Sequence, residues 1–212
     1  MNAGGIVLCG GRSSRMGRPK AWLPFGNELM LQRVVRVLRT VVDPVVVVAA
    51  PRQSVPRLPA DVHVVRDEVE GKGPLGGLAT GLSALGKHSD VAYLSSCDVP
   101  FLRPEFIHRV LSFLTMHKPA LASDNRTPEP LIAVPQVDHY LHPLAAAYHR
   151  SILPQVTELL NANRLRPIFL FDLAPTRIIT PAELTDCDPE LASLRNINTP
   201  EQYELALQEF TE

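Results

Sequence analysis

Residues 5–20 read GIVLCGGRSSRMGRPK, and this stretch decides the fold. Its apolar start, residues 5–9, indicates a strand that stops abruptly at Gly10-Gly11. Paired glycines directly after a buried strand let the backbone turn sharply and bring its N–H groups against a ligand. Four cations follow within ten residues: Arg12, Arg15, Arg18 and Lys20. Such a local density of positive charge favours a highly charged anion, and a triphosphate fits this description.

The rest of the chain alternates between two kinds of pattern. Strand-like apolar runs lie at 45–50, 62–65, 91–96, 119–123, 131–134 and 177–180, and helix-like patterns lie at 29–41, 75–85, 104–114, 152–160 and from Pro200 onward. Residues 167–171 fit either a helix or a strand. This alternation predicts an α/β fold with a mostly parallel sheet. Because no linker-like stretch divides the chain, we expect a single domain over residues 1–212.

The composition excludes several classes of protein. The chain has 212 residues, 45% of them hydrophobic, and a formal net charge of −1. A near-neutral protein lacks the global field needed to grip nucleic acid or an anionic membrane. Three widely spaced cysteines support neither a disulfide framework nor a structural zinc site. The sequence shows no signal-peptide or membrane-spanning pattern, so we expect a cytoplasmic protein without a nucleic-acid or membrane partner.

Residues 8–26, LCGGRSSRMGRPKAWLPFG, resemble the LxGGxSxRMGxxKxxL signature of the MobA-type nucleotidyltransferases. The signature is long and specific, and further matches follow in the family's order across nearly the whole chain. Enzymes of this family join GMP to molybdopterin, which makes the guanine dinucleotide form of the molybdenum cofactor. The resemblance implies a three-layer, Rossmann-like α/β nucleotidyltransferase fold with a mostly parallel central sheet.

Two further motifs carry the resemblance into the middle of the chain. Asp67 is followed by GPLGG at 73–77, which resembles the family's GPLxG loop, and CDVPF at 97–101 resembles its C-D-x-P-F/Y motif, in which the Asp holds the catalytic magnesium. Without the resemblance, the residues at 73–77 indicate a turn with few side chains before a helix, and a flat purine could lie against such a turn. A carboxylate directly after a buried strand lies where open α/β sheets bind ligands, and Mg²⁺ prefers such oxygen ligands.

The last matches lie toward the carboxyl terminus. PLAAAY at 143–148 and RNINTPE at 195–201 resemble the family's P-L-x-A-x-Y and N-x-N-T-P-E segments. The second match implies that Asn196 and Asn198 lie near the active site, where they could hold the acceptor. Taken alone, Asn-Thr-Pro-Glu is also a favourable helix start.

Two positions depart from the family's pattern. Cys9 stands where the family usually has Ala, and we interpret it as a structural replacement. The second strand ends without the Asn that many members use at the nucleotide site, which weakens the case for guanine more than the case for nucleotidyl transfer. Just after the cationic loop, we expect Trp22 and Phe25 to pack in the core.

The resemblance implies a nucleotide site with an in-line transfer. Its nucleotide-binding residues would be Leu8, Cys9, Gly10, Gly11, Lys20, Asp67, Gly73, Pro74 and Asp98, and its catalytic residues Arg15, Lys20 and Asp98. We expect Arg15 and Lys20 to hold the β- and γ-phosphates of the nucleotide. Asp98 would hold Mg²⁺, the expected cofactor, as a Lewis acid and template.

We therefore expect an enzyme that transfers GMP from GTP to molybdopterin and releases pyrophosphate. The alternatives are a CTP-dependent molybdopterin cytidylyltransferase, a sugar- or polyol-phosphate nucleotidyltransferase, and a nucleotide-binding module without catalysis. Gly10-Gly11 and the loop at 73–77 favour guanine, and the retained Arg15, Lys20 and Asp98 argue against a module without catalysis. The acceptor rests on the resemblance alone, as does an expected transient contact with proteins that deliver the cofactor.

Overall fold

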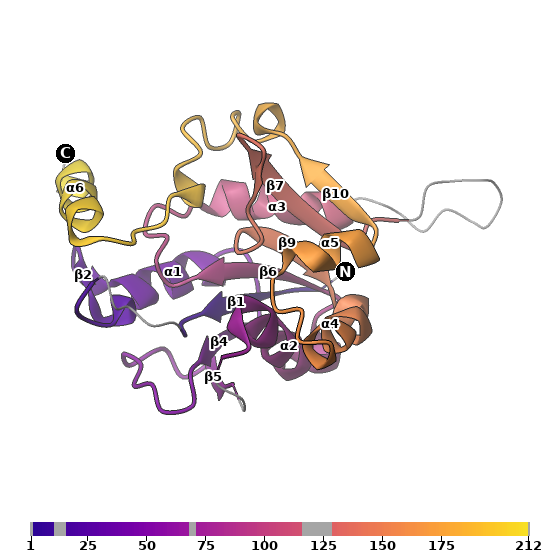
Figure 1. The fold of residues 1–212 in the computed structure, drawn as a ribbon. Coiled ribbons are helices and arrows are strands. Elements are labelled where there is room, and N and C mark those ends of the chain that lie inside the picture. Colours follow the sequence, from indigo (N-terminus) through magenta and orange to yellow (C-terminus); the bar gives the residue numbers. More distant parts are fainter. Residues whose placement is uncertain (1, 11–15, 68–70, 116–128, 212) are drawn as a thin grey trace.

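A computed structural model describes residues 2–10, 16–67, 71–115 and 129–211 of the chain (Figure 1). The strand predicted at 119–123 lies outside the described residues. So do Gly11 and Arg15, two of the residues predicted for the nucleotide site.

A mostly parallel sheet forms the centre of the molecule (Figure 1). Its strands are β1 (Ala3–Leu8), β4 (Val45–Ala49), β5 (His63–Arg66), β6 (Val91–Ser96), β7 (Ile132–Val137), β8 (Tyr140–Leu141), β9 (Ala146–His149) and β10 (Thr176–Ile179). They lie in the order β10-β7-β9-β6-β1-β4-β5, and β8 pairs with β7. Strand β9 is antiparallel to both of its neighbours, β6 and β7, whereas β1 is parallel to β4 and β6. The predicted α/β class and the mostly parallel sheet are confirmed.

Helices cover both faces of this sheet, which gives three layers. The helices are α1 (Met30–Arg39), α2 (Gly73–Leu85), α3 (Pro104–Thr115), α4 (Leu153–Asn161), α5 (Ile168–Leu173) and α6 (Pro200–Thr211). Short 3₁₀ turns are η1 (Lys20–Trp22), η2 (Gly86–His88), η3 (Arg150–Ile152), η4 (Pro181–Glu183) and η5 (Ala192–Leu194). Helices α1 and α3 pack on one face, and α2, α4 and α5 pack on the other (Figure 1).

The central strands are buried on both faces. In β1, Val7 belongs to the core under α1 and α3, whereas Ile6 and Leu8 belong to the core under α2 and α4. Because successive side chains of a strand point to opposite faces, an unbroken apolar run is what a strand covered on both sides requires. The unbroken apolar run of β4 and the buried residues along β1 and β6 agree with the position of these strands in the middle of the sheet.

Glycines let helix α2 approach β1 closely. A Cβ on Gly77 would lie 2.8 Å from Cδ2 of Leu8, and a Cβ on Gly81 would lie 2.6 Å from Cγ2 of Ile6. The helix begins at Gly73, two residues earlier than the pattern predicted. The residues GPLGG therefore form its first turn and are not a separate turn before it, with Pro at a position where a missing backbone N–H costs least.

The carboxyl-terminal helix α6 packs on a small hairpin near the amino terminus. Strands β2 (Pro24–Phe25) and β3 (Glu28–Leu29) form this hairpin, and Phe25 and Met30 share a third core with Tyr203 of α6. The hydroxyl of Tyr203 donates to the carbonyl of Pro24. Phe25 is buried as expected, but the expectation for Trp22 was wrong. Its side chain is 42% exposed, because its indole N–H reaches out to the carbonyl of Ser54.

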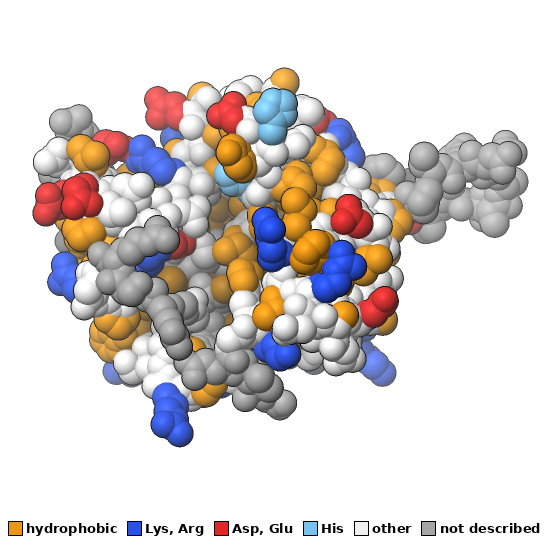
Figure 2. Space-filling view, viewed as in Figure 1, with side chains coloured by type: hydrophobic (Ala, Val, Ile, Leu, Met, Phe, Trp, Pro, Cys, Tyr) orange, Lys and Arg blue, Asp and Glu red, His pale blue; other side chains and the backbone are white. Residues whose placement is uncertain are grey.

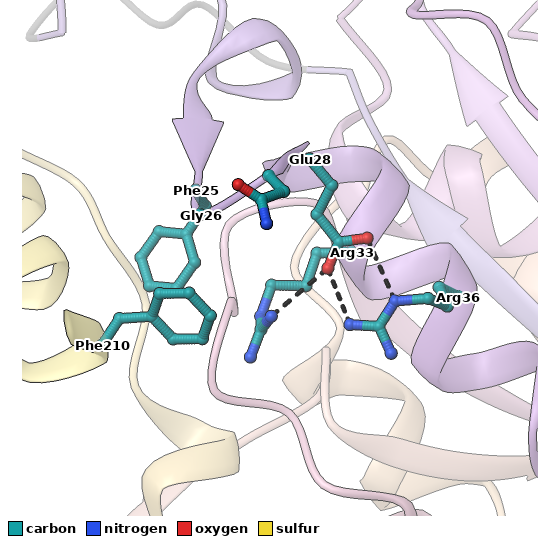
Figure 3. A pocket seen from close by; sticks show the side chains of 7 residues that line it. Phe25, Gly26, Glu28, Arg33, Arg36 and Phe210 are labelled. Atoms are coloured by element: carbon teal, nitrogen blue, oxygen red, sulfur yellow. Dashed lines mark hydrogen bonds and ion pairs between the residues drawn. The ribbon is translucent and has the colours of Figure 1, made fainter. Parts of the chain in front are cut away.

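A cavity of about 530 Å³ lies between the hairpin turn, α1 and the end of α6 (Figure 3). The guanidinium of Arg33 lies over the ring of Phe210 and pairs with Glu28, which also binds Arg36. Through Nε, Arg33 donates to the carbonyl of Pro100 at 2.5 Å. Through these contacts Arg33 ties α1 to α6 and to the segment after β6, so we assign the residues around the cavity a structural role.

Among the residues that the structure describes, no helix combines the length and the apolar character that crossing a membrane requires.

Candidate active site

The candidate site lies where three neighbouring strands end. Backbone hydrogen bonds also join the residues directly after β1 and β6 to the neighbouring strands. The N–H of Cys9 donates to the carbonyl of Val48 at 2.8 Å, and the N–H of Cys97 donates to the carbonyl of Leu8 at 3.1 Å. Gly10 and Asp98 are the next residues along the chain. Carboxyl ends of parallel strands meet at one edge, and ligands of open α/β sheets bind at this edge. The structure thus brings the predicted residues Leu8, Cys9, Gly10 and Asp98 to one place.

Lys20 reaches this edge from the far side of the cationic loop. Its Nζ lies 2.7 Å from Oδ2 of Asp98 and 2.7 Å from Oδ1 of Asn198. The two charged side chains are 16% and 12% exposed, so this ion pair is largely withdrawn from water. A cation held between a carboxylate and an amide oxygen, beside a strand end, is a preorganised place for a phosphate or for a metal ion.

The carboxylate of Asp98 is fixed from several sides. The hydroxyl of Ser96 donates to Oδ1 at 2.6 Å, and the amide of Asn196 donates to the same oxygen at 3.2 Å. The N–H of Ile197 donates to the carbonyl of Asp98 at 2.9 Å. The segment before α6 thus closes over the end of β6, which places Asn196 and Asn198 in the site. Sequence reasoning missed Ser96, although its place two residues before a candidate carboxylate was a usable signal.

Gln53 fixes the ends of β1 and β4 relative to each other. Its amide nitrogen donates to the carbonyl of Cys9 at 2.9 Å and lies 3.4 Å from the Cys9 sulfur, and its amide oxygen accepts from the N–H of Ala50 at 3.1 Å. It stands close to the strand end at which the expected Asn is missing. No pattern in the sequence pointed to Gln53, because its contact with Cys9 spans 44 positions.

The two thiols at the strand ends belong to the same buried core. Interaction with the side chain of Cys97 is the main reason why the pKa of Cys9 is lowered. The same contact, together with burial, raises the pKa of Cys97. Both side chains are almost fully buried, next to Gly10 on one strand and Asp98 on the other.

Asp67 and the start of α2 form a second wall of the same edge. The N–H of Asp67 donates to the carbonyl of Ala49 at 3.0 Å, which places Asp67 just beyond the end of β5. Its carboxylate accepts from Thr80 of α2 at 2.8 Å, and burial raises its pKa. Gly73 and Pro74 are exposed in the first turn of α2. Their exposure leaves room for a ligand against this helix start.

Figure 2 shows that this face of the molecule is hollowed above the central strands, with hydrophobic side chains on its walls and Lys and Arg side chains along one side. Of the residues described, no three His, Cys, Asp or Glu side chains group together as a metal cage would. A metal ion here would depend on the carboxylate of Asp98 together with oxygen atoms of a ligand.

A mostly parallel sheet between two layers of helices, with a lysine and a carboxylate meeting at the ends of its central strands, is typical of α/β enzymes that bind phosphorylated ligands at this edge. The chain belongs to the family described as the MobA-like NTP transferase domain, whose model matches residues 5–175.

Named relatives agree with this assignment over almost their whole length. A protein of Halalkalibacterium halodurans, named "Probable molybdenum cofactor guanylyltransferase", is 30% identical over 201 residues, which cover 93% of each chain. A relative of the same name from Mycobacterium avium is 33% identical over 204 residues, covering 94% of this chain and 92% of the relative. The crystal structure of molybdopterin-guanine dinucleotide biosynthesis protein A from Archaeoglobus fulgidus superimposes with a TM-score of 0.77 at 20% identity, covering 98% of each chain.

Proposed function

We propose that this protein transfers GMP from GTP to molybdopterin and releases pyrophosphate. The observation that carries the proposal is the position of Lys20, whose ammonium lies between the oxygens of Asp98 and Asn198 at the carboxyl edge of the sheet. The names of relatives at 30 and 33% identity support guanine as the base and molybdopterin as the acceptor.

The reaction needs alignment and charge neutralisation more than a base. A terminal phosphate oxygen of the acceptor attacks the α-phosphorus of GTP, a new P–O bond forms, and the bond to pyrophosphate breaks. Because the attacking phosphate is already anionic, the main task of the site is to hold several anions together in line. The backbone N–H groups of Gly10 and Gly11 would contribute donors, and Arg15 with Lys20 would hold the β- and γ-phosphates.

The Lys20–Asp98 pair prepares the site for these anions. An ammonium has three donors, and in this structure Asp98 and Asn198 accept from it. When a triphosphate enters, its oxygens would compete for the same ammonium. Lys20 would then move toward the phosphates, and the carboxylate of Asp98 would lose its cation. This exchange would leave Asp98 ready for another positive charge.

The donors around Asp98 fit a divalent metal ion, and Mg²⁺ in particular. Asp98 and Asn198 present oxygen atoms, and the ammonium between them shows that a positive charge is accepted there. Magnesium is often held by one or two carboxylates plus phosphate oxygens. When bound, it would act as a Lewis acid toward the phosphate that is attacked. Ser96 and Asn196 would keep the carboxylate of Asp98 in position.

The nucleoside would lie against the wall formed by Asp67 and the start of α2. The exposed backbone at Gly73 and Pro74 allows a flat base to approach closely. The carboxylate of Asp67, held by Thr80, would accept hydrogen bonds from the nucleoside. Asn196 and Asn198, on the segment that closes over Asp98, would face the acceptor.

The test is a transfer assay with mass spectrometry of the product. The purified protein is incubated with Mg²⁺ and molybdopterin, and with GTP, CTP, ATP or UTP in parallel. We expect pyrophosphate release and the mass of the guanine dinucleotide with GTP only, and neither product with the Asp98→Asn variant. Product with CTP and none with GTP would reassign the protein to cytidylyl transfer. Nucleotide binding without any product would support a binding module instead.

A further inference from the structure

Two thiols stand opposite each other at the ends of the central strands. Strand β1 is parallel to β6, with Leu8 opposite Ser96. Cys9 and Cys97 are the residues directly after the two strands, so the register at the strand ends brings them close to each other. They belong to one hydrophobic core, which shows that they point to the same face of the sheet.

This arrangement suits a disulfide bond. Neighbouring strands lie about 4.8 Å apart. Disulfides join residues whose Cα atoms are separated by about 4.4 to 6.8 Å, with side chains directed at each other. The pair meets both conditions through its register and its shared face. A bond between the two sulfur atoms would therefore need rotation of both side chains and a small adjustment of the two strand ends.

The bond would form inside the machinery of the site. Cys9 precedes Gly10 at the start of the glycine loop, and Cys97 precedes Asp98. The Cys9 sulfur also contacts the amide of Gln53, which fixes the end of β1 to the end of β4. A covalent link between the sulfurs would pull on both strand ends and on the Gln53 contact. The backbone donors at Gly10 and the carboxylate of Asp98 would both shift.

We propose that Cys9 and Cys97 form a reversible intramolecular disulfide that switches the nucleotide site off under oxidising conditions. This inference goes beyond the proposed function, because it requires a nucleotide at this edge of the sheet and does not depend on which acceptor is used.

Hydrogen peroxide serves as the oxidant. One sulfur attacks the peroxide, an S–O bond forms, the O–O bond breaks, and water leaves. The second sulfur then displaces the hydroxyl of this sulfenic acid as a second water, which forms the S–S bond. Two thiols are oxidised and one peroxide is reduced, so electrons and atoms balance. A dithiol reductant such as dithiothreitol reverses the bond by thiol–disulfide exchange.

The experiment uses the full chain with the Cys187→Ala substitution. The chain has three cysteines, so this background leaves only the proposed pair. Cys187 is partly exposed and follows η4, and its thiol donates to the carbonyl of Leu184. Its removal therefore excludes the third thiol as a source of mixed disulfides without touching the site. Samples are treated with hydrogen peroxide, and one half is then reduced with dithiothreitol.

The chemical readout is the mass and the thiol content of the monomer. We expect the protein to lose the mass of two hydrogen atoms and both free thiols, with a Cys9–Cys97 crosslink in the peptide map and full recovery on reduction. Two thiols that stay free, a linkage between molecules, or added oxygen atoms without a crosslink would overturn the proposal. These readouts do not involve transfer, so they are independent of whether the proposed function is right.

The functional readout compares the oxidised and the reduced form of each variant. In the Cys187→Ala protein, GTP-induced thermal stabilisation and transfer should fall on oxidation, transfer by roughly 10²-fold, which is the scale of a misplaced reacting group. In the Cys9→Ala/Cys187→Ala protein the ratio of oxidised to reduced signal should stay near one. A crosslink that leaves GTP stabilisation unchanged would contradict the switch, as would an equal loss in the variant without Cys9.

Discussion

The ammonium of Lys20 lies 2.7 Å from Oδ2 of Asp98, although 78 positions separate the two residues in the chain. The contact joins the end of the cationic loop to the end of β6. In the absence of a ligand, the negative charge of the Asp98 carboxylate is balanced by the positive charge of the Lys20 ammonium. A triphosphate can take the place of Asp98 as the partner of Lys20, and a metal ion can take the place of Lys20 as the partner of Asp98.

The first prediction concerns the charge of Lys20. The Lys20→Ala variant should lose roughly 3 kcal/mol of transition-state stabilisation, about a 10²-fold fall in kcat/KM for GTP, because a charge-assisted donor to the phosphates is gone. Lys87→Ala is the matched control, since Lys87 is exposed in η2 and precedes β6 at the opposite edge of the sheet. Equal activity of the two variants in steady-state kinetics would remove Lys20 from the phosphate site.

Ser96 is predicted to act through Asp98. The Ser96→Ala variant loses the 2.6 Å hydrogen bond to Oδ1. We expect transfer to fall by roughly 10- to 100-fold, the usual cost of losing a partner that orients a metal ligand, with a higher Mg²⁺ requirement. A magnesium titration of kcat separates this role from a structural one. The control is Ser95→Ala on the same strand, whose buried hydroxyl has only a weak contact with the carbonyl of Ser96. Ser96→Ala with an unchanged magnesium titration would argue against the positioning role.

We expect the ionised carboxylate of Asp67 to lower the stability of the folded protein and to strengthen the binding of GTP. Burial raises the pKa of its carboxyl group, so the folded state holds this proton more tightly than the unfolded state does. The contribution of Asp67 to stability is therefore greatest at a pH below the unfolded pKa, and it is lost as the pH rises through the folded pKa.

The Asp67→Asn variant keeps an oxygen for Thr80 and removes the charge. Relative to the wild type, the variant should gain stability in denaturant unfolding as the pH rises from 3.5 to 8, roughly the range in which carboxyl groups titrate and beyond, and it should be the more stable protein at pH 8. GTP-induced stabilisation should be weaker. A variant that binds GTP as well as the wild type would exclude Asp67 from the nucleotide contacts.

Two glycines of α2 should respond differently to the same substitution. Alanine gains about 1 kcal/mol over glycine in a helix interior. At Gly81 the added Cβ meets the branched carbon Cγ2 of Ile6 at 2.6 Å, so overpacking of about 1–3 kcal/mol outweighs the gain. At Gly77 it meets the end of the flexible Leu8 side chain at 2.8 Å. Urea unfolding should show that Gly81→Ala is the less stable of the two variants. If Gly77→Ala were the less stable variant, the contact between Gly81 and Ile6 would not limit how closely α2 packs on β1.

Much of the fold followed from local patterns. Mainly apolar runs predicted β1, β4 and β6, because a strand that is covered on both faces needs apolar side chains on both. The resemblance also implied that Lys20 and Asp98 belong to one site, and the structure brings their side chains together in an ion pair.

Other features depend on tertiary contacts that no local pattern records. Strand β9 is the alanine-rich segment Ala146–His149, which becomes a strand because β6 and β7 flank it. Trp22 looked like a core residue, yet its indole finds a hydrogen bond at the surface. Gln53 acts across 44 positions to hold Cys9, a separation that motif reading does not reach.

The most direct test is a crystal structure of the protein with a non-hydrolysable GTP analogue and Mg²⁺. We predict that the triphosphate lies over Gly10, that Nζ of Lys20 has left Asp98 for the phosphate oxygens, and that the carboxylate of Asp98 coordinates the metal ion. An intact Lys20–Asp98 pair, with the nucleotide bound at another edge of the sheet, would contradict the account.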